Sequence, residues 1–528
     1  MTADSEKMTV LLHERIPLDE ELARSSRYYY VPFEVPEDTE AVVVSYRVHG
    51  DSRIDIGLLE PSGREGAAST LGGSRLGPTS TAPSGFTFRG WSGSGRSVFV
   101  AGRYLSTPGY FCRKLMPGMW WVALGLASVR DSCEVELRLE AAEPGAFPPE
   151  KSPPVLGNPV PGRSADAVHT TALRDAAREL DASRQKAPGI RGVPLGGQLH
   201  GHRAGFVCGD FHTHSWHSGD AKTPVSDMIA AAEERKLDFM AITDHNTISH
   251  WEEIDFFQPL TRVVLIKGQE VTTYKGHFNA FLWGDLAEFR IENDDQLDRA
   301  LKSRTTESGL VSVNHPKVVG PSWQLEFHEA FEAMEAWGAP WLWFNNDSLS
   351  RWDGLWRNGR RIAGIGGSDV HDLYALPVHQ YGCPTTWVYV GRASPTPLEV
   401  LEAVRARRVV VTATPDAPFV TVETRPNRES QWRVCVGSKA DPREQVRVRL
   451  LGVRGACELR VVGESGGEER AEVLGHGDFV AELGDVSRFG SWFRAELWGA
   501  GLYLAGPVGS STTALLAVTN PVEVDQTS

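Results

Sequence analysis

Residues 209–220 read GDFHTHSWHSGD, and His212 and His214 in this segment follow an apolar, strand-like run. Successive side chains of a β-strand point to opposite faces, so residues two apart share a face. Both imidazoles can therefore bind one ion together. Asp369 and His371, in GIGGSDVH at residues 364–371, repeat this spacing far along the chain and could bind from the other side of the same site.

Around this stretch, strand-like and helix-like segments alternate from about residue 206 to residue 412. We predict strands in FVCGDFHTH (206–214), LDFMAITDH (237–245), RVVLIKGQEV (262–271), HFNAFLWG (277–284), GLVSVNHP (309–316), RIAGIGGSDVH (361–371) and TTWVYVG (385–391). Helices are predicted in PVSDMIAAAEERK (224–236) and PTPLEVLEAVRARR (395–408). This alternation is typical of an α/β fold with a parallel sheet or barrel.

Metal-binding residue types fall at or just beyond the ends of these predicted strands. In βα folds the carboxyl ends of the strands form a shared rim where active sites lie. A single histidine there is commonly a capping or surface residue, but five separate segments with this ending predict a metal site. Imidazole and carboxylate ligands without nearby cysteine favour catalytic zinc, manganese or iron. The candidate ligands are His212, His214, Asp220, His245, Glu270, His315, Asp369 and His371.

Five motifs, in order, resemble those of the polymerase and histidinol phosphatase (PHP) superfamily. They are GDFHTHSWHSGD, AITDHNT (241–247), GQEVTTYKGHFNAF (268–281), VNHP (313–316) and GIGGSDVH. More narrowly, GDFHTH, the segment 270–277, and the tail motifs WFRAELWG (492–499) and AVTNPVEV (517–524) resemble the CehA/McbA branch, which includes carbaryl hydrolases. The branch resemblance runs from about residue 209 to the C-terminus, and the N-terminal region matches only by type.

The resemblance implies a distorted (β/α)7 barrel that holds two or three divalent ions. The implied ligands are His212, His214 and Asp369 for the first ion, Glu270 as a bridge to the second with His277 and His315, and Asp220, His245 and His371 for the third. One motif departs from the family pattern, because the usual Ser-Asp-Gly is Ser218-Gly219-Asp220 here, which displaces the carboxylate by one position. His217 could substitute, although we expect it to line the entrance.

This ligand set predicts hydrolysis by a metal-bridging hydroxide, because two cations lower the pKa of a shared water and neutralise charge on the substrate. We expect catalytic roles for Glu270, His245 and Asp369, with Asp369 or a non-ligating histidine passing a proton to the leaving group. Lys275 and Lys317 lie close in sequence to proposed ligands. They could bind an anionic substrate or be solvated lysines at strand ends.

Three functions remain open at this stage. The first is hydrolysis of phosphoesters, such as nucleotides, phosphodiesters or oligonucleotide ends. The second is hydrolysis of a carbamate, ester or amide, as the branch resemblance implies. The third is a non-catalytic PHP module used for interaction, whose mark would be the loss of ligands. The formal net charge of −14 argues against binding of duplex nucleic acid, so we expect a small-molecule or nucleotide-like substrate.

The chain is long enough, at 528 residues, for several domains. We predict a β-sandwich-like domain over residues 1–143, a proline-rich linker with a short helix over 144–195, the PHP-type barrel over 196–412 and a small β domain over 413–528. The N-terminus lacks a basic, then apolar, export signal, and no run of 18 apolar residues occurs. We therefore expect a soluble cytoplasmic enzyme that does not act at a membrane.

Overall fold

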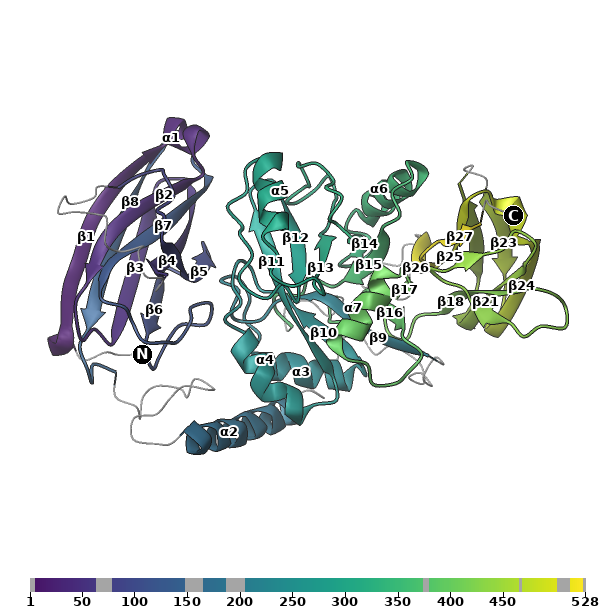
Figure 1. The fold of residues 1–528 in the computed structure, drawn as a ribbon, viewed down its shortest axis with the longest axis horizontal. Helices are drawn as coiled ribbons and strands as arrows, with labels where there is room; N and C mark the ends of the chain where they lie inside the picture. Colours follow the sequence, from purple (N-terminus) through teal and green to yellow (C-terminus); the bar gives the residue numbers. More distant parts are fainter. Residues whose placement is uncertain are drawn as a thin grey trace.

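The computed structural model describes residues 5–62, 78–147, 165–186, 205–373, 379–464, 468–500 and 513–525. Three regions lie in a row in Figure 1: β-sheets of the N-terminal region, a central region of mixed sheet and helices, and β-strands of the C-terminal region. Of the predicted proline-rich linker, 144–195, the parts 148–164 and 187–195 lie outside the described residues. Its short helix is α2, Ala165–Lys186.

The N-terminal region consists of two antiparallel four-stranded sheets, ordered β1-β8-β3-β6 and β2-β7-β4-β5. Their strands are β1 (Met8–Asp19), β2 (Tyr28–Val35), β3 (Ala41–His49), β4 (Arg53–Pro61), β5 (Phe86–Gly93), β6 (Val98–Gly102), β7 (Gly118–Ser128) and β8 (Ser132–Ala142). Buried and partly exposed residues alternate along β8, which is typical of a sheet with one face in a core. Trp120 and Val135 lie fully buried in the hydrophobic cluster of this region.

The central sheet positions the candidate site. Its strand order is β15-β14-β13-β12-β11-β10-β9-β16-β17. The strands are β9 (Phe206–Thr213), β10 (Phe239–Ile242), β11 (Val264–Thr273), β12 (Gly276–Phe281), β13 (Leu310–Val313), β14 (Ala333–Gly338), β15 (Ala363–Gly367), β16 (Thr385–Tyr389) and β17 (Val409–Thr412). Seven of these correspond to predicted strands, whereas β14 and β17 were not predicted.

This sheet is mixed rather than uniformly parallel. Strands β9, β10 and β11 run parallel, as do β13, β14 and β15. Strand β12 is antiparallel to both neighbours, because β11 turns directly into it at Gly276 without an intervening helix. Strand β16 is antiparallel to β9. A parallel bridge between Thr213 and Val370 brings the ends of β9 and β15 together. The sheet is thus curled, and it departs from a regular (β/α)7 alternation.

Helices lie in the connections between successive central strands (Figure 1). They are α3 (Val225–Glu234), α4 (Trp251–Phe257), α5 (Asp294–Lys302), α6 (Asn345–Arg357) and α7 (Pro397–Arg405). Thr396 begins α7 with a capping box, in which its side chain and that of Glu399 bond each other's backbone N–H groups. Helix α2 packs against α3, where Arg184 Nε lies 2.8 Å from Glu233 Oε2.

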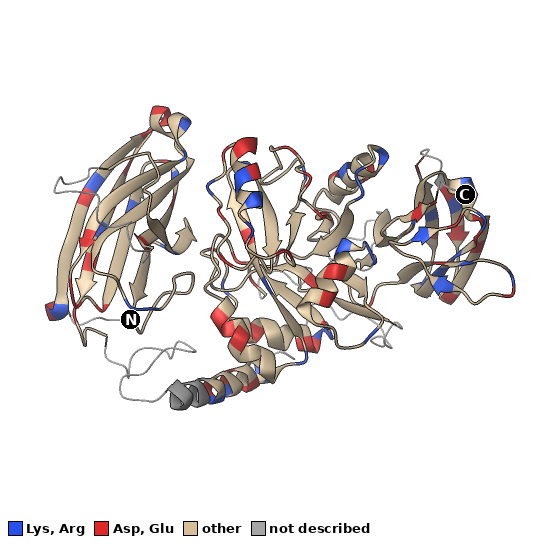
Figure 2. Ribbon diagram, in the orientation of Figure 1, with Lys and Arg blue, Asp and Glu red and all other residues tan. Residues whose placement is uncertain are grey.

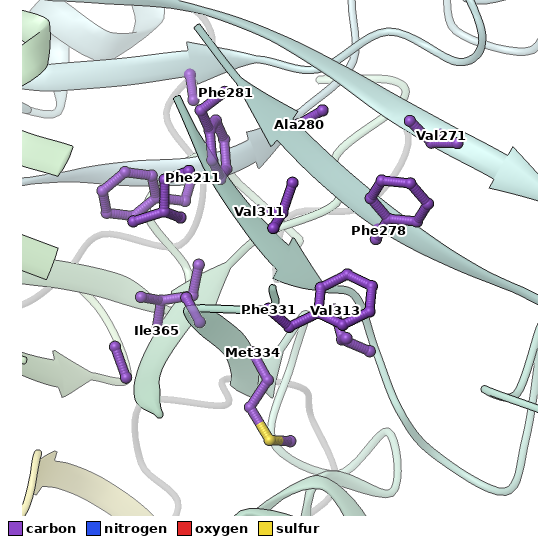
Figure 3. Packing of buried hydrophobic residues seen from close by; sticks show 14 of the residues in the cluster. Phe211, Val271, Phe278, Ala280, Phe281, Val311, Val313, Phe331, Met334 and Ile365 are labelled. Carbon is purple, nitrogen blue, oxygen red and sulfur yellow. The ribbon is translucent and has the colours of Figure 1, made fainter. Parts of the chain in front are cut away.

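A hydrophobic cluster fills the space behind the site and continues into the N-terminal region. Figure 3 shows aromatic and aliphatic side chains of the central sheet packed together, including Phe211, Phe278 and Phe331. The same cluster contains Trp91 of β5, whose ring centroid lies 5.0 Å from that of Phe289. The N-terminal sheets therefore pack on the central region through a shared core.

In the C-terminal region, a separate antiparallel sheet has the order β19-β18-β21-β24. Strands β26 (Thr513–Thr519), β25 (Trp492–Ala500), β22 (Cys457–Gly463) and β23 (Glu468–Val473) instead extend the central sheet from β17. Val410 of β17 pairs with Thr519 of β26. The sheet is thus continuous across the boundary that we predicted at residue 412. The other strands are β18 (Phe419–Arg425), β19 (Arg433–Val434), β20 (Lys439–Ala440), β21 (Gln445–Arg454), β24 (His476–Asp485) and β27 (Val522–Val524).

Acidic and basic residues are interspersed along the elements of all three regions in Figure 2. Within the described part of the chain, no helix has both the length and the apolar character needed to cross a membrane.

Candidate metal centre

Histidines and carboxylates from five separate segments meet at one end of the central sheet. Some lie within strands β9 and β11, and the others follow β9, β10, β13 and β15. All of these positions are near the carboxyl ends of parallel strands, where the loops that follow the strands form a site. Asp369, at φ 56°, and His315, at φ 26°, have left-handed backbone conformations. Such conformations cost energy for residues other than glycine and cluster at functional sites.

The first group comprises His212, His214 and Asp369, one ligand atom of each lying within 4.8 Å of the others. Nε2 of His214 is 3.0 Å from Nε2 of His212 and 3.0 Å from Oδ1 of Asp369. His212 and His214 are fully buried, whereas the side chain of Asp369 is 29% exposed. The His-X-His spacing thus places both imidazoles on one side of β9.

The second group comprises His212, Glu270 and His315. Oε1 of Glu270 is 3.3 Å from Nε2 of His212 and 3.2 Å from Nε2 of His315. Nδ1 of His277, on the adjacent strand β12, is also 3.2 Å from this oxygen. Glu270 therefore occupies the middle of this group, where the family pattern predicts a bridging carboxylate.

The third group comprises His214, His245 and His371. Nε2 of His245 lies 3.0 Å from Nε2 of His371. Asp220 lies beside this pair, with its carboxylate oxygens 3.6 Å from His245 and 3.7 Å from His371. The displaced carboxylate thus still reaches the third group, although its side chain is about half exposed.

The tautomers that the neighbours favour leave ring nitrogens pointing inward. Nδ1 of His212 lies 2.7 Å from Glu335, and Nδ1 of His214 lies 3.2 Å from the Ser218 hydroxyl. Nδ1 of His245 lies 2.7 Å from the Thr272 hydroxyl, and Nδ1 of His371 lies 3.0 Å from the backbone oxygen of Asp369. In each ring Nδ1 can donate outward, so Nε2 presents a lone pair to the centre. This arrangement of outer partners is typical of metal-binding histidines.

These atoms fit divalent ions. Ligand atoms bound about 2.0–2.2 Å from one ion lie about 3 Å apart, which is the separation of the inward Nε2 atoms of His212 and His214. Two lone pairs at that distance repel unless a cation or proton lies between them. Oε2 of Glu270 is fully buried. It lies 2.7 Å from Nδ1 of His245 and 3.6 Å from Nε2 of His214, so it also faces the ligand groups.

The electrostatics of the centre keep the carboxylates charged. Burial alone raises the pKa of Glu270, but the surrounding imidazoles, His212 first, outweigh it and hold this pKa well below its usual range. The pKa of Asp369 is depressed in the same way. Burial and the neighbouring His371 and His245 lower the pKa of His214 to about 3, so this ring is neutral and can act as a ligand.

Several further residues, which were not predicted, position the ligands. Glu335 of β14 is fully buried and contacts both His212 and the backbone N–H of His315. Asn314 donates from Nδ2 to Oε1 of Glu270 at 2.8 Å. Asp210, whose pKa burial raises to about 6, accepts backbone hydrogen bonds from His212, Ser368 and Gly382. The sequence offered no signal for Glu335, because the strand that contains it, β14, was not predicted.

Close packing explains why the carboxylate is displaced to position 220. A Cβ added at Gly219 would lie 1.8 Å from the backbone oxygen of Ser92, in the N-terminal region. A Cβ at Gly95 would likewise lie 2.1 Å from the backbone oxygen of Gly219. Two backbones therefore touch where the family pattern has an aspartate, and only glycine fits there.

The other three predicted site residues are placed differently. His217 is buried, with Nδ1 2.7 Å from Ser249 Oγ and Nε2 3.0 Å from Glu253 Oε1, so the structure does not bring it into the ligand groups. Lys317 is nearly buried and donates to the backbone oxygen of Gly338 at 2.6 Å. Burial lowers the pKa of its ammonium. Lys275 is partly exposed, in the turn between β11 and β12.

Solved structures give distant matches. A protein from Bifidobacterium adolescentis, assigned as a metal-dependent phosphoesterase, is 16% identical, with a TM-score of 0.22 over 31% of this chain and 87% of its own. A β-glucosidase from Streptomyces venezuelae, in complex with D-glucose, is 8% identical, with a TM-score of 0.17 over 98% of this chain and 49% of its own. At these scores neither structure defines the fold or function of this chain. No curated protein matches the sequence.

The match to a family model covers the first part of the candidate centre. Residues 210–303 match the model of the PHP domain. This range contains His212, His214, His245, Glu270 and His277, which the structure gathers with ligands from the strands that follow. The central region of this chain therefore contains a PHP domain.

Proposed function

We propose that this chain is a metal-dependent phosphoesterase that acts on nucleotides, phosphodiesters or oligonucleotide ends. The observation that carries the proposal is the overlap of three ligand groups, in which His212 and His214 each belong to two. Overlapping groups favour neighbouring ions, and closely spaced cations suit a phosphoryl group whose charge is spread over several oxygens. Two or three ions of zinc, manganese or iron match the donor atoms.

Divalent ions bound here would lower the pKa of a bound water and neutralise charge on a phosphoryl oxygen. The reaction is then hydrolysis: an oxygen from water bonds to phosphorus, the ester P–O bond breaks, and the leaving oxygen takes up a proton. The chain's own groups divide the remaining work. Glu270 is fully buried and holds its neighbours in place. Asp369 reaches solvent as an ionised carboxylate, so it can accept a proton from water, while the leaving oxygen takes its proton from solvent.

We do not expect Lys317 to contact an anionic substrate directly; its charge acts on the substrate from a distance. Its ammonium is fixed on the Gly338 backbone, 2.6 Å from the oxygen, and Glu335 and Asp369 are the acidic groups that act on it. It therefore contributes positive potential behind the ligand groups, rather than a freely moving side chain. Lys275 is more exposed and stays a prediction for substrate binding.

The test combines metal analysis of the purified protein with parallel assays. The substrates are p-nitrophenyl phosphate, bis-p-nitrophenyl phosphate and 1-naphthyl methylcarbamate. We expect bound divalent metal and release of p-nitrophenol that a chelator abolishes. Turnover of the carbamate alone would replace the phosphoesterase with the carbamate hydrolase that the branch resemblance implies. Metal binding without any turnover would favour a non-catalytic PHP module.

Two variants connect the activity to the centre. His212→Ala and Glu270→Ala each remove a ligand, and we expect both to abolish turnover while the circular dichroism spectrum is retained. His13→Ala is the matched control, because His13 is a half-exposed histidine on β1 whose Nε2 lies 3.4 Å from Oε1 of Glu136. Unchanged turnover in the two ligand variants would show that the activity arises elsewhere.

A further inference from the structure

A cavity of about 530 Å³ joins the metal centre to the N-terminal region. One side is lined by Asp220, His245 and His277 of the PHP domain. The other side is lined by Arg27, Arg53, Asp55 and Trp91, which come from the N-terminal β-strands and the loop before β2. Its volume lies in the range of about 300–1,000 Å³ that is typical of small-molecule sites. A substrate held at the centre would therefore extend toward the N-terminal region.

This second wall is firmly attached to the PHP domain. The hydroxyl of Tyr274, in the turn after β11, donates to Oδ2 of Asp55 at 2.8 Å. A Cβ at Gly125 of β7 would lie 2.2 Å from this hydroxyl, so the two regions are in close contact at this point. The ring of Tyr28 lies 5.7 Å from that of Tyr274. These contacts fix the distance between the wall and the ligand groups.

Two guanidinium groups on this wall have unused donors. Arg27 donates from Nη1 to the backbone oxygen of Leu126 at 3.1 Å, and Arg53 donates from Nε to the Ser94 hydroxyl at 2.7 Å. Neither side chain makes an ion pair within the described parts of the chain. By contrast, the exposed Arg130 pairs with Asp51. Nη2 of Arg27 and both terminal nitrogens of Arg53 are thus available to a ligand.

Asp55 lines the same cavity as these arginines, and its Oδ2 already accepts the Tyr274 hydrogen bond at 2.8 Å. Burial raises the pKa of its carboxyl group, while the Tyr274 hydrogen bond and the charge of Arg53 oppose this shift. A guanidinium binds a planar or tetrahedral oxyanion through parallel N–H donors. The wall therefore suits a negatively charged group that points away from the metal centre.

We propose that this cavity is the subsite for the leaving group, and that Arg27 and Arg53 bind a carboxylate or phosphate on that part of the substrate. The proposal rests on the proposed phosphoesterase function and narrows its substrate class to phosphoesters whose leaving group is itself anionic. The N-terminal region then determines specificity, while the PHP domain supplies the reacting centre.

The kinetic test compares phenyl phosphate with 3-carboxyphenyl phosphate, which differ only in the carboxylate on the leaving group. We expect wild type to prefer the carboxylated substrate in kcat/KM. In Arg53→Ala and in Arg27→Ala this preference should fall about tenfold or more, since a hydrogen bond to a charged group contributes about 1.5–3 kcal/mol. Arg47→Ala, on the exposed face of β3, is the control and should keep the wild-type preference.

A binding measurement separates the two proposals. Saturation-transfer NMR with 3-hydroxybenzoate, and with phenol as its uncharged counterpart, reports on the cavity without turnover. We expect binding of 3-hydroxybenzoate by wild type and the Arg47 variant, and loss of that binding in the Arg53 and Arg27 variants. An inactive wild type that still shows this pattern would overturn only the phosphoesterase. The subsite proposal would be overturned if wild type is active, the two arginine variants keep its substrate preference, and 3-hydroxybenzoate binds equally well to wild type and to both variants.

Discussion

Oε1 of Glu335 lies 2.7 Å from Nδ1 of His212, while Oε2 of the same carboxylate accepts the backbone N–H of His315 at 2.6 Å. One buried side chain on β14 thus orients two ligand residues from β9 and from the end of β13. Both belong to the group that contains Glu270. The position of Glu335 therefore controls how far apart these imidazoles stand.

Replacement of Glu335 by glutamine should weaken metal binding about 10–100-fold, the usual effect of losing an outer partner of a metal-binding histidine. Glutamine can accept the His212 proton, but its NH2 group cannot accept from the His315 backbone. Competition with a fluorescent chelator measures the affinity. Glu332→Gln is the control, because Glu332 lies just before β14 and pairs with Arg405 instead. Equal affinities in the two variants would show that Glu335 does not position the ligands.

The difference between the ligands and Glu335 shows what the sequence can and cannot predict. The ligands follow apolar runs in short, recognisable motifs, so His212 and Glu270 could be placed at one rim without knowledge of the packing. Glu335 lies in a tryptophan-rich segment, 335–356, in which we predicted no strand. All six residues of β14 are buried, so its sequence lacks the polar alternation that marks a strand.

Contacts between regions were equally unpredictable. The sequence shows that Gly219 departs from the family motif, but the reason is the backbone of Ser92, more than a hundred positions earlier. The antiparallel direction of β12 depends on a tight turn at Gly276, at φ 127°, and not on the apolar pattern of the strand. Both features arise from tertiary packing, on which local sequence patterns carry little information.

Gly219→Ala should separate the loop that carries Asp220 from the N-terminal region, because the new methyl group would lie 1.8 Å from the Ser92 oxygen. Overpacking of this kind costs about 1–3 kcal/mol. We expect a lower melting temperature and fewer metal ions per chain by mass spectrometry of the intact protein under native conditions. Gly354→Ala, where a Cβ on α6 meets nothing within 4 Å, should melt no lower than wild type. Full metal content and stability in the Gly219 variant would contradict the packing argument.

Arg96 should stabilise the same loop from the N-terminal side. Its guanidinium donates to the backbone oxygens of Trp216 and Ser218. Arg96→Ala would leave buried carbonyl groups without their donor, at a cost of about 1–3 kcal/mol. We expect a lower midpoint in the first transition of urea unfolding, together with weaker metal binding. Arg103→Ala, an exposed arginine of the same region, should change neither. A normal midpoint in the Arg96 variant would show that these hydrogen bonds do not hold the loop.

Replacement of Asp55, on the wall of the cavity, by asparagine should change the stability of the protein by an amount that depends on pH. Burial raises the pKa of this carboxyl group, with the Tyr274 hydrogen bond opposing the shift. The folded chain therefore binds the proton more tightly than the unfolded chain, so stability is lost as pH rises through the raised pKa. Asparagine does not titrate and can accept the same hydrogen bond. The melting temperature of Asp55→Asn minus that of wild type should thus be smallest near pH 4 and increase toward pH 7.

Asp51→Asn, at a highly exposed position, should show no such trend. A difference that stays constant from pH 4 to pH 7 would mean that Asp55 has the same pKa in the folded and unfolded chains.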